Sequence, residues 1–292
     1  MVERVAIESE GLKLAGLLHI PDGLKPGEKR PAFLVLHGFG GNKEGEQGAW
    51  ATRTLLQWGY ICLQIDFRGC GESEGVRGRI VPQEEVIDAQ NAISFLETRA
   101  EVDPKRIAIC GSSLGAAVGI VTAGSDKRVA ALISQGGWGS GPRKSMQQHP
   151  PGEAWNKFLG MIMEGVRHRE RTGESLMVER FDIVPVPEKL RALLRDGHMQ
   201  FTAETALGIF LFHPENAIGA IAPRPVLLLH AVRDSVTPSA ESIELYKHAK
   251  SPVELHLIDN ADHFMFAESN PRVTNIVKDW LTAYFPLEGK LP

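Results

Sequence analysis

The sequence is poor in cysteine, and this shortage argues against metal and disulfide frameworks. Only three of its 292 residues are cysteine: Cys62, Cys70 and Cys110. No Cys-x-x-Cys pair or His/Cys cluster suggests a metal site. A sparse, odd set is typical of reduced thiols, and Cys62 and Cys110 lie in apolar, strand-like runs that predict burial. We therefore expect no metal and no other cofactor.

Long apolar runs and an excess of one charge are also missing. No apolar run approaches the ~20 residues that span a bilayer. The net charge is -4, without a Lys/Arg run that would suit nucleic acid. The opening MVERVAIESE alternates charged and apolar residues, unlike the basic-then-apolar pattern of a secretory signal. We expect a cytoplasmic protein that acts on a small molecule and binds neither membrane nor nucleic acid.

What the sequence does contain is an alternation of strand-like and helix-like segments. Two strands, 2–9 and 12–20, are expected to pair antiparallel. Continuous apolar runs too short for helices are typical of strands buried on both faces; they occur at 31–38, 59–67, 106–111, 129–135, 225–232 and 253–260. Helical patterns occupy 49–58, 83–100, 113–123 and 272–285. This order predicts an α/β fold with a mostly parallel central sheet and helices on both faces.

The alternation stops between residues 139 and 216. This stretch contains no clean strand pattern; it has a loop-like start, an amphipathic helix over 155–171 and a second helical piece. We interpret it as a helical cap inserted between two sheet strands, with 1–138 and 217–292 forming the core domain. An exposed cap or edge surface could support a homodimer, although no residue pattern indicates one.

The strongest local motif is GSSLG, residues 111–115. It follows a predicted buried strand and begins a helix, the context in which a G-x-S-x-G turn exposes its central serine as a nucleophile. Such a pattern also occurs by chance in glycine-rich loops, and Ser112 is a rival within it. Ser113 is favoured because it alone has the two-residue spacing to both glycines.

A serine nucleophile needs a base and a group that orients the base. Asp234 follows the predicted strand 225–232, and His263 follows the strand 253–260. Each could be an ordinary loop residue, but together they give the order Ser, Asp, His after successive strands. Asp259 and Asp262 are rival carboxylates that rank lower because they share the loop of His263.

Two N–H groups are needed to stabilise an oxyanion. One candidate is the N–H of Leu114, and the other is that of Phe39 in the HGFGG loop, residues 37–41. His37 is interpreted as a brace for this loop. The later stretch DFRGCGES, residues 66–73, lacks the P-loop pattern; we expect Asp66 or Arg68 to buttress the active-site loops through an ion pair.

Together the motifs HGFGGNKEG, DFRGCGESEG, GSSLG, HAVRDSVTP and NADHF resemble the α/β-hydrolase superfamily. The similarity is greatest to the branch that holds feruloyl (cinnamoyl) esterases, dienelactone-hydrolase-like proteins and the prolyl-oligopeptidase catalytic domain. It implies Ser113, Asp234 and His263 as a catalytic triad and the Phe39 and Leu114 amides as the oxyanion hole. Relatives often have His-Gly where this chain has His230-Ala231, a difference that should not disturb Asp234.

An inserted cap is expected to lie over the serine and shape an apolar substrate pocket. Candidate lining residues are methionines and aromatics of the cap, together with Trp138 just before it; in the cap they are Trp155, Phe158, Met161, Met163, Met199 and Phe201. At helical spacing such residues are more often core.

The leading hypothesis is a serine hydrolase that cleaves a small or medium carboxylic ester with an apolar or aromatic part. The same triad would also serve carbon–carbon cleavage of a β-diketone-like compound, amide hydrolysis or acyl transfer. A non-enzymatic binding role is the third alternative.

Overall fold

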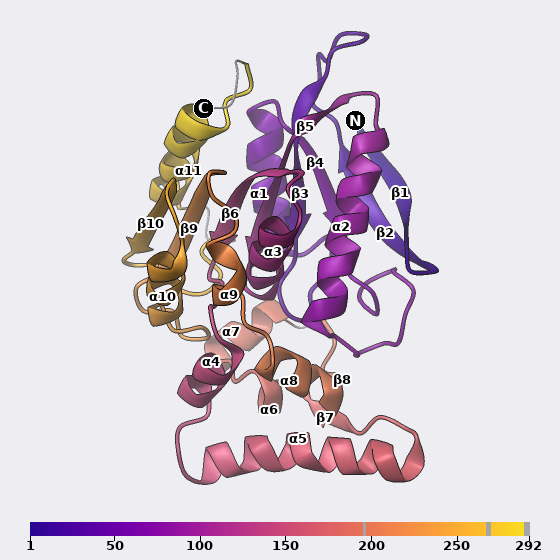
Figure 1. Cartoon of the computed structure of the whole chain (residues 1–292), viewed down its shortest axis with the longest axis vertical. Coiled ribbons are helices and arrows are strands. Elements are labelled where there is room, and N and C mark those ends of the chain that lie inside the picture. Colours follow the sequence, from indigo (N-terminus) through magenta and orange to yellow (C-terminus); the bar gives the residue numbers. More distant parts are fainter. Residues whose placement is uncertain (195–196, 267–269, 289–292) are drawn as a thin grey trace.

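A twisted eight-stranded sheet forms the centre of the computed structural model, which describes residues 1–194, 197–266 and 270–288. The strands lie in the order β1-β2-β4-β3-β5-β6-β9-β10. The first two pair antiparallel, β2 pairs antiparallel with β4, and all later neighbours are parallel (Figure 1). Their bounds are β1 Val2–Ser9, β2 Leu12–His19, β3 Arg30–Leu36, β4 Ile61–Ile65, β5 Val102–Ser112, β6 Val129–Gln135, β9 Val226–Ala231 and β10 Val253–Ile258. The mostly parallel sheet predicted from the apolar runs is confirmed.

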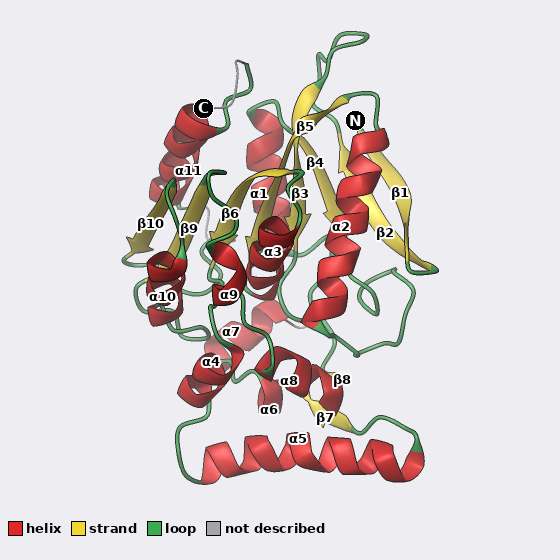
Figure 2. Ribbon diagram, viewed as in Figure 1, coloured by secondary structure: helices red, strands yellow, loops and turns green. Residues whose placement is uncertain are grey.

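Helices cover both faces of the sheet (Figure 2). Because side chains alternate along a strand, Phe33 and Val35 of β3 pack in one core with α1 (Glu46–Gln57) and α11 (Pro271–Tyr284). Leu34 and Leu36 point to the other core, which α2 (Pro82–Thr98), α3 (Leu114–Ser125) and α10 (Ala240–His248) complete. The three cysteines are buried and free. Within the described ranges, no helix is long and apolar enough to cross a membrane.

The segment between β6 and β9 lies beyond the carboxyl ends of the parallel strands (Figure 1). We call residues 139–216 the cap, whose bounds as a domain stay a prediction. Its elements are α4 Gly141–Gln148, α5 Glu153–Thr172, β7 Met177–Glu179, α6 Arg180–Ile183, α7 Glu188–Arg191, a 3-10 turn at Ala192–Leu194, β8 Gln200–Thr202, α8 Ala203–Phe210 and the start of α9 Glu215–Ile218.

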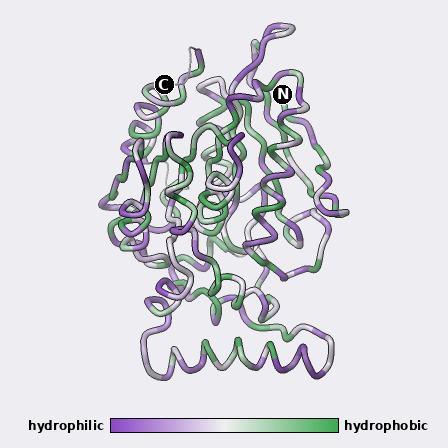
Figure 3. Tube along the Cα trace, in the orientation of Figure 1, coloured by the Kyte–Doolittle hydropathy of each residue, from purple (hydrophilic) through white to green (hydrophobic). Residues whose placement is uncertain are grey.

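The expectation that the cap contains no strand is wrong, because β7 and β8 pair antiparallel as a small second sheet. Three residues are too few for a strand pattern to stand out. The long amphipathic helix is α5, along which hydrophobic and hydrophilic residues alternate (Figure 3). Its apolar stripe packs on the cap itself, where Phe158 and Ile162 are buried.

Candidate active site

The turn at Ser113 is set by close packing of backbone around it. β5 ends at Ser112 and α3 begins at Leu114, so Ser113 alone makes the turn, at a φ of 55° that side-chain-bearing residues seldom adopt. A Cβ on Gly111 would lie 2.4 Å from the Gly115 carbonyl oxygen, and one on Gly115 would lie 2.4 Å from that of His37. Only glycine fits at both positions, which explains the G-x-S-x-G spacing.

Three predicted residues meet at this turn. His263 Nε2 lies 2.9 Å from Ser113 Oγ, and His263 Nδ1 lies 2.8 Å from Asp234 Oδ2. Asp234 comes three residues after β9, and His263 five residues after β10. Because parallel strands bring their carboxyl ends to one edge of the sheet, these loops converge on the serine.

The Asp234 carboxylate is held from several sides. Its Oδ1 accepts hydrogen bonds of 2.8 Å from the N–H groups of Val236 and Thr237. Its Oδ2 also lies 3.3 Å from His230 Nε2, which is 2.9 Å from the Thr237 carbonyl oxygen. Burial acts to raise the pKa of Asp234, but the charge of His263 and the hydrogen bond from His230 outweigh it. The resulting pKa lies well below its usual range.

His230 is therefore a part of the site that its place in an apolar strand did not indicate. The His230-Ala231 pair leaves Asp234 in contact with His263, and the imidazole of His230 itself lies against the carboxylate. Both acceptors near Nε2 lack a proton, so Nε2 carries the hydrogen. On the other side of the ring, Nδ1 lies 2.6 Å from Ser242 Oγ, a residue of α10.

The rival carboxylates occupy other places in the histidine loop. Asp262 Oδ1 accepts hydrogen bonds from the N–H groups of Ser235 and His263, and Oδ2 lies 3.0 Å from Lys189 Nζ. It therefore braces the main chain of the histidine loop, while the imidazole contacts Asp234. Asp259 is exposed.

The HGFGG loop lies against the serine. The Gly38 carbonyl accepts a hydrogen bond from the Gly41 N–H at 3.0 Å and lies 2.9 Å from His37 Nδ1. The Phe67 N–H donates to His37 Nε2, so Nδ1 carries the proton and donates to Gly38. Burial lowers the pKa of His37, which keeps the ring neutral. Because C=O and N–H of a trans peptide point in opposite directions, fixing the Gly38 carbonyl also orients the Phe39 N–H.

The second amide is that of Leu114, the first residue of α3. An N–H in the first turn has no acceptor within its helix. Throughout the described ranges, neither this N–H nor that of Phe39 donates a hydrogen bond to the protein. Both are therefore available to a developing negative charge beside Ser113.

Two buried ion pairs support the loops below the site. Asp66 accepts from both the Nζ and the main-chain N–H of Lys43, at 2.8 and 2.6 Å. Arg68 pairs with Asp88 at 2.7 Å. Lys43 is the second residue after the HGFGG loop, so the Asp66 pair ties that loop to the end of β4.

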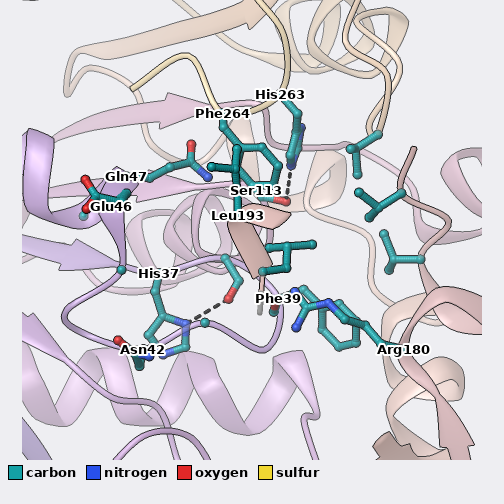
Figure 4. Close-up of a pocket in the computed structure, with 18 residues that line it drawn as sticks. His37, Phe39, Asn42, Glu46, Gln47, Ser113, Arg180, Leu193, His263 and Phe264 are labelled. Atoms are coloured by element: carbon teal, nitrogen blue, oxygen red, sulfur yellow. Dashed lines mark hydrogen bonds between the residues drawn. The ribbon is translucent and has the colours of Figure 1, made fainter. Parts of the chain in front are cut away.

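A cleft of about 810 Å³, including its open mouth, contains Ser113 and His263. One wall comes from the core, and the other from the cap (Figure 4). The core wall comprises His37, Gly38, Phe39, Gly41, Asn42, Gly45, Glu46, Gln47, Gly48, Val236 and Phe264, and the cap wall Arg180, Val184, Val186, Leu193 and Leu194. The cap wall is thus apolar except for Arg180.

The seven residues predicted to line the pocket lie elsewhere: Trp138, Trp155, Phe158, Met161, Met163, Met199 and Phe201. Trp138 is buried beneath the ammonium of Lys144, 4.5 Å from the ring centre. On α5, Phe158 is buried in the cap's own core and Met163 is 53% exposed. The helix lies at the side of the cap away from the sheet (Figure 1), so its methionines and aromatics do not reach the serine. The cap residues that do line the cleft come from the short helical turns and the connecting loop at 180–194, which are too short to show a periodic signal.

No group of three or more His, Cys, Asp or Glu side chains in the described ranges could hold a metal ion. What the site does offer is a serine hydroxyl, a base within hydrogen-bond distance and a carboxylate that orients the base. Together with two available amides, such an arrangement is suited to acyl transfer.

Fold and site together define an α/β hydrolase. Residues 27–270 match the family Hydrolase_4, described as "Serine aminopeptidase, S33", and the chain belongs to this family of α/β hydrolases.

Curated relatives match most of the chain at low identity. The quorum-quenching protein AidA of Acinetobacter baumannii (strain MDR-ZJ06) is 26% identical over 277 residues, which cover 88% of each protein. The polyketide transferase ATR5 of Stachybotrys chlorohalonatus (strain IBT 40285) is 27% identical over 270 residues, covering 87% of this chain and 86% of the relative.

Solved structures share the fold. The α/β hydrolase GrgF from Penicillium sp. sh18 superposes with a TM-score of 0.80 at 21% identity, covering 97% of both chains. Est1E from Butyrivibrio proteoclasticus, solved with ferulic acid bound, has a TM-score of 0.68 at 20% identity and covers 95% of this chain and 98% of its own. The resemblance to the hydrolase branch that includes feruloyl esterases is confirmed at the level of fold.

Proposed function

We propose that the protein is a serine hydrolase that cleaves a carboxylic ester of a small to medium, apolar or aromatic substrate. The observation that carries the proposal is the hydrogen-bonded chain from Ser113 through His263 to Asp234, which opens into a cleft with an apolar cap wall. The substrate is a small molecule, and the reaction needs no cofactor. The cytoplasmic location stays a prediction.

The reaction follows from the positions of these groups. His263 Nε2 takes the proton from Ser113 Oγ as that oxygen attacks the ester carbonyl carbon. The carbonyl oxygen becomes an oxyanion that the Phe39 and Leu114 N–H groups stabilise. Asp234 stabilises the imidazolium, which returns the proton to the leaving alcohol as the ester C–O bond breaks. Water then attacks the acyl-enzyme with His263 again as the base, and the acid is released.

The test is hydrolysis of a series of p-nitrophenyl esters with acyl chains of two to eight carbons, combined with labelling by a fluorophosphonate. We expect turnover that improves with chain length over part of the series, because longer chains bury more surface on Val184, Val186, Leu193 and Leu194. Ser113→Ala should abolish labelling and turnover. Ser112→Ala is the matched control and should retain both. A wild-type protein that neither labels nor turns over the esters would overturn the proposal.

Transfer of the acyl group to another acceptor is the second candidate. It is favoured by the relative named as a polyketide transferase. Adding an alcohol or thiol to the ester assay distinguishes the two: faster p-nitrophenol release with formation of the new ester indicates transfer, and unchanged release indicates hydrolysis.

A further inference from the structure

Arg180 of the cap contacts the HGFGG loop through its guanidinium. It is the first residue of α6, only 4% exposed, and lines the cleft beside Phe39 (Figure 4). Nη2 donates to the Phe39 carbonyl at 2.6 Å, and Nη1 donates to the His198 carbonyl at 3.0 Å and, more weakly, to that of Gly40 at 3.4 Å. One side chain thus joins two stretches of the cap to consecutive peptides of the loop.

Aromatic rings hold the same guanidinium in place. Its centre lies 5.2 Å from the ring centre of Phe39 and 5.8 Å from that of Phe201. The two rings are in contact, with centres 4.4 Å apart. Arg180 is therefore restrained by its stacking as well as by its hydrogen bonds.

The small second sheet explains how the cap supplies both residues. β7 ends at Glu179, opposite Gln200, and the Arg180 N–H donates to the Met199 carbonyl at 2.8 Å. This pairing places Arg180 directly beside β8, which carries Phe201. The two-stranded β7–β8 sheet is thus a platform that presents an arginine and a phenylalanine to the loop.

The partners of Arg180 differ from those of other well-packed arginines in this protein. Arg68 pairs with Asp88, and Arg143 pairs with Glu215 and Glu241. For Arg180, no carboxylate of the described residues lies within ion-pair distance; its Nη1 and Nη2 donate to neutral carbonyls, and its buried Nε has no hydrogen-bond partner among the described residues. Burial lowers the pKa of Arg180 to about 10, so the group is still charged at neutral pH. An uncompensated cation therefore stands at the wall of the cleft.

We propose that Arg180 is a positioning residue that fixes the oxyanion loop from the cap. The inference rests on the proposed function. The Phe39 N–H shares a peptide group with the Gly38 carbonyl, which His37 and the Gly41 N–H hold in place. Arg180 holds the next carbonyl along the chain, that of Phe39. With both neighbouring carbonyls held, rotation of the Phe39 N–H away from the cleft is blocked. The positive charge further favours negative charge at the adjacent site.

The test compares Arg180→Met and Arg180→Lys with the wild type. Loss of one oxyanion donor costs about 10²–10³-fold in kcat; displacement of a donor should cost less, so we expect a decrease of about 10- to 100-fold for the methionine variant. KM should change less than threefold. The lysine variant keeps the charge and one donor and should recover part of kcat. Arg169→Met is a matched control in the cap, because Arg169 pairs with Glu204, and it should behave as wild type.

Binding of a trifluoromethyl ketone separates positioning from general structural support, because its adduct with the serine places an oxyanion in the hole. We expect the inhibition constant of an alkylthio trifluoromethyl ketone to rise in parallel with the fall in kcat. A methionine variant with a lowered melting temperature but wild-type kcat per titrated active site would overturn the inference, as would unchanged ketone affinity. If the methionine variant does not fold, the lysine variant decides by the same two measurements. Absence of a fluorophosphonate adduct in the wild type would instead overturn the proposed function, and this inference with it.

Discussion

Replacing Asp234 with asparagine should leave a folded protein that has lost most of its activity. The carboxylate Oδ1 accepts two backbone N–H groups, from Val236 and Thr237, so the amide oxygen of asparagine must take that place. The amide NH₂ then faces His263 Nδ1, where the wild type has an acceptor at 2.8 Å. Nδ1 is forced to accept, the proton moves to Nε2, and Nε2 can no longer take the proton of Ser113.

The size of the loss follows from this wrong tautomer. In a serine triad, replacing the acid by its amide lowers kcat about 10⁴-fold, which corresponds to about 5 kcal/mol of transition-state stabilisation. The assay is kcat/KM for p-nitrophenyl butyrate at pH 8, with active sites counted by fluorophosphonate and folding checked by the melting temperature. Asp259→Asn, on the exposed end of the same histidine loop, is the matched control and should retain wild-type activity.

An Asp234→Asn variant within tenfold of wild type would refute the reasoning. So would a larger loss from Asp262→Asn, because Asp262 contacts the main chain of His263 and should affect only the placement of the loop. We expect the Asp262 variant to lose less than tenfold.

Three further predictions concern stability. Burial lowers the pKa of Lys144 to about 8 from an ordinary 10.5, so at pH 7 the fold bears the full cost of the buried charge, on the order of 3 kcal/mol. Lys144→Met should therefore unfold at a higher temperature at pH 7, and the difference should shrink as the pH rises from 8 to 10. Gly115→Ala places a Cβ against the His37 carbonyl oxygen; we expect a loss of about 1–3 kcal/mol in the free energy of unfolding, measured in urea, and slower phosphonate labelling. Folding depresses the pKa of Asp234, so its charge stabilises the fold above pH ~4, the unfolded value, and this contribution is lost on acidification. The melting temperature of Asp234→Asn should consequently approach that of wild type as the pH falls below 4.

The core of the fold could be predicted because its strands are buried on both faces. Such strands appear as short continuous apolar runs, and β6 was predicted with the bounds that the structure shows, 129–135. Ser113 could be predicted as the nucleophile because the backbone on either side of it is packed too closely for any Cβ, so both flanking positions must be glycine. Asp234 and His263 followed from their places after successive strands. In each case a local steric or hydrophobic requirement restricts which residues can stand at these positions, so the requirement is visible in the sequence.

The cap could not be predicted in the same way. Its methionine and aromatic stripe on α5 is a real amphipathic signal, but it records the packing of cap against cap. The side chains that reach the cleft come from short turns between residues 180 and 194, where tertiary contacts override local pattern. Likewise His230 reads as one residue of an apolar strand, and only the folded chain shows its imidazole beside Asp234.

The two walls of the cleft have different parts in substrate choice. The core wall carries the groups that attack the carbonyl, and the cap wall carries the apolar surface that selects what is attacked. If the cap served only for selection, exchanging it for that of a relative would change KM and substrate preference while leaving the chemical step intact. Arg180 connects the two walls, because its guanidinium holds the loop that bears the Phe39 N–H. A cap exchange that omits an arginine at this position should therefore lower kcat for every ester in a panel, and restoring that single arginine should raise kcat across the panel without restoring the original preference.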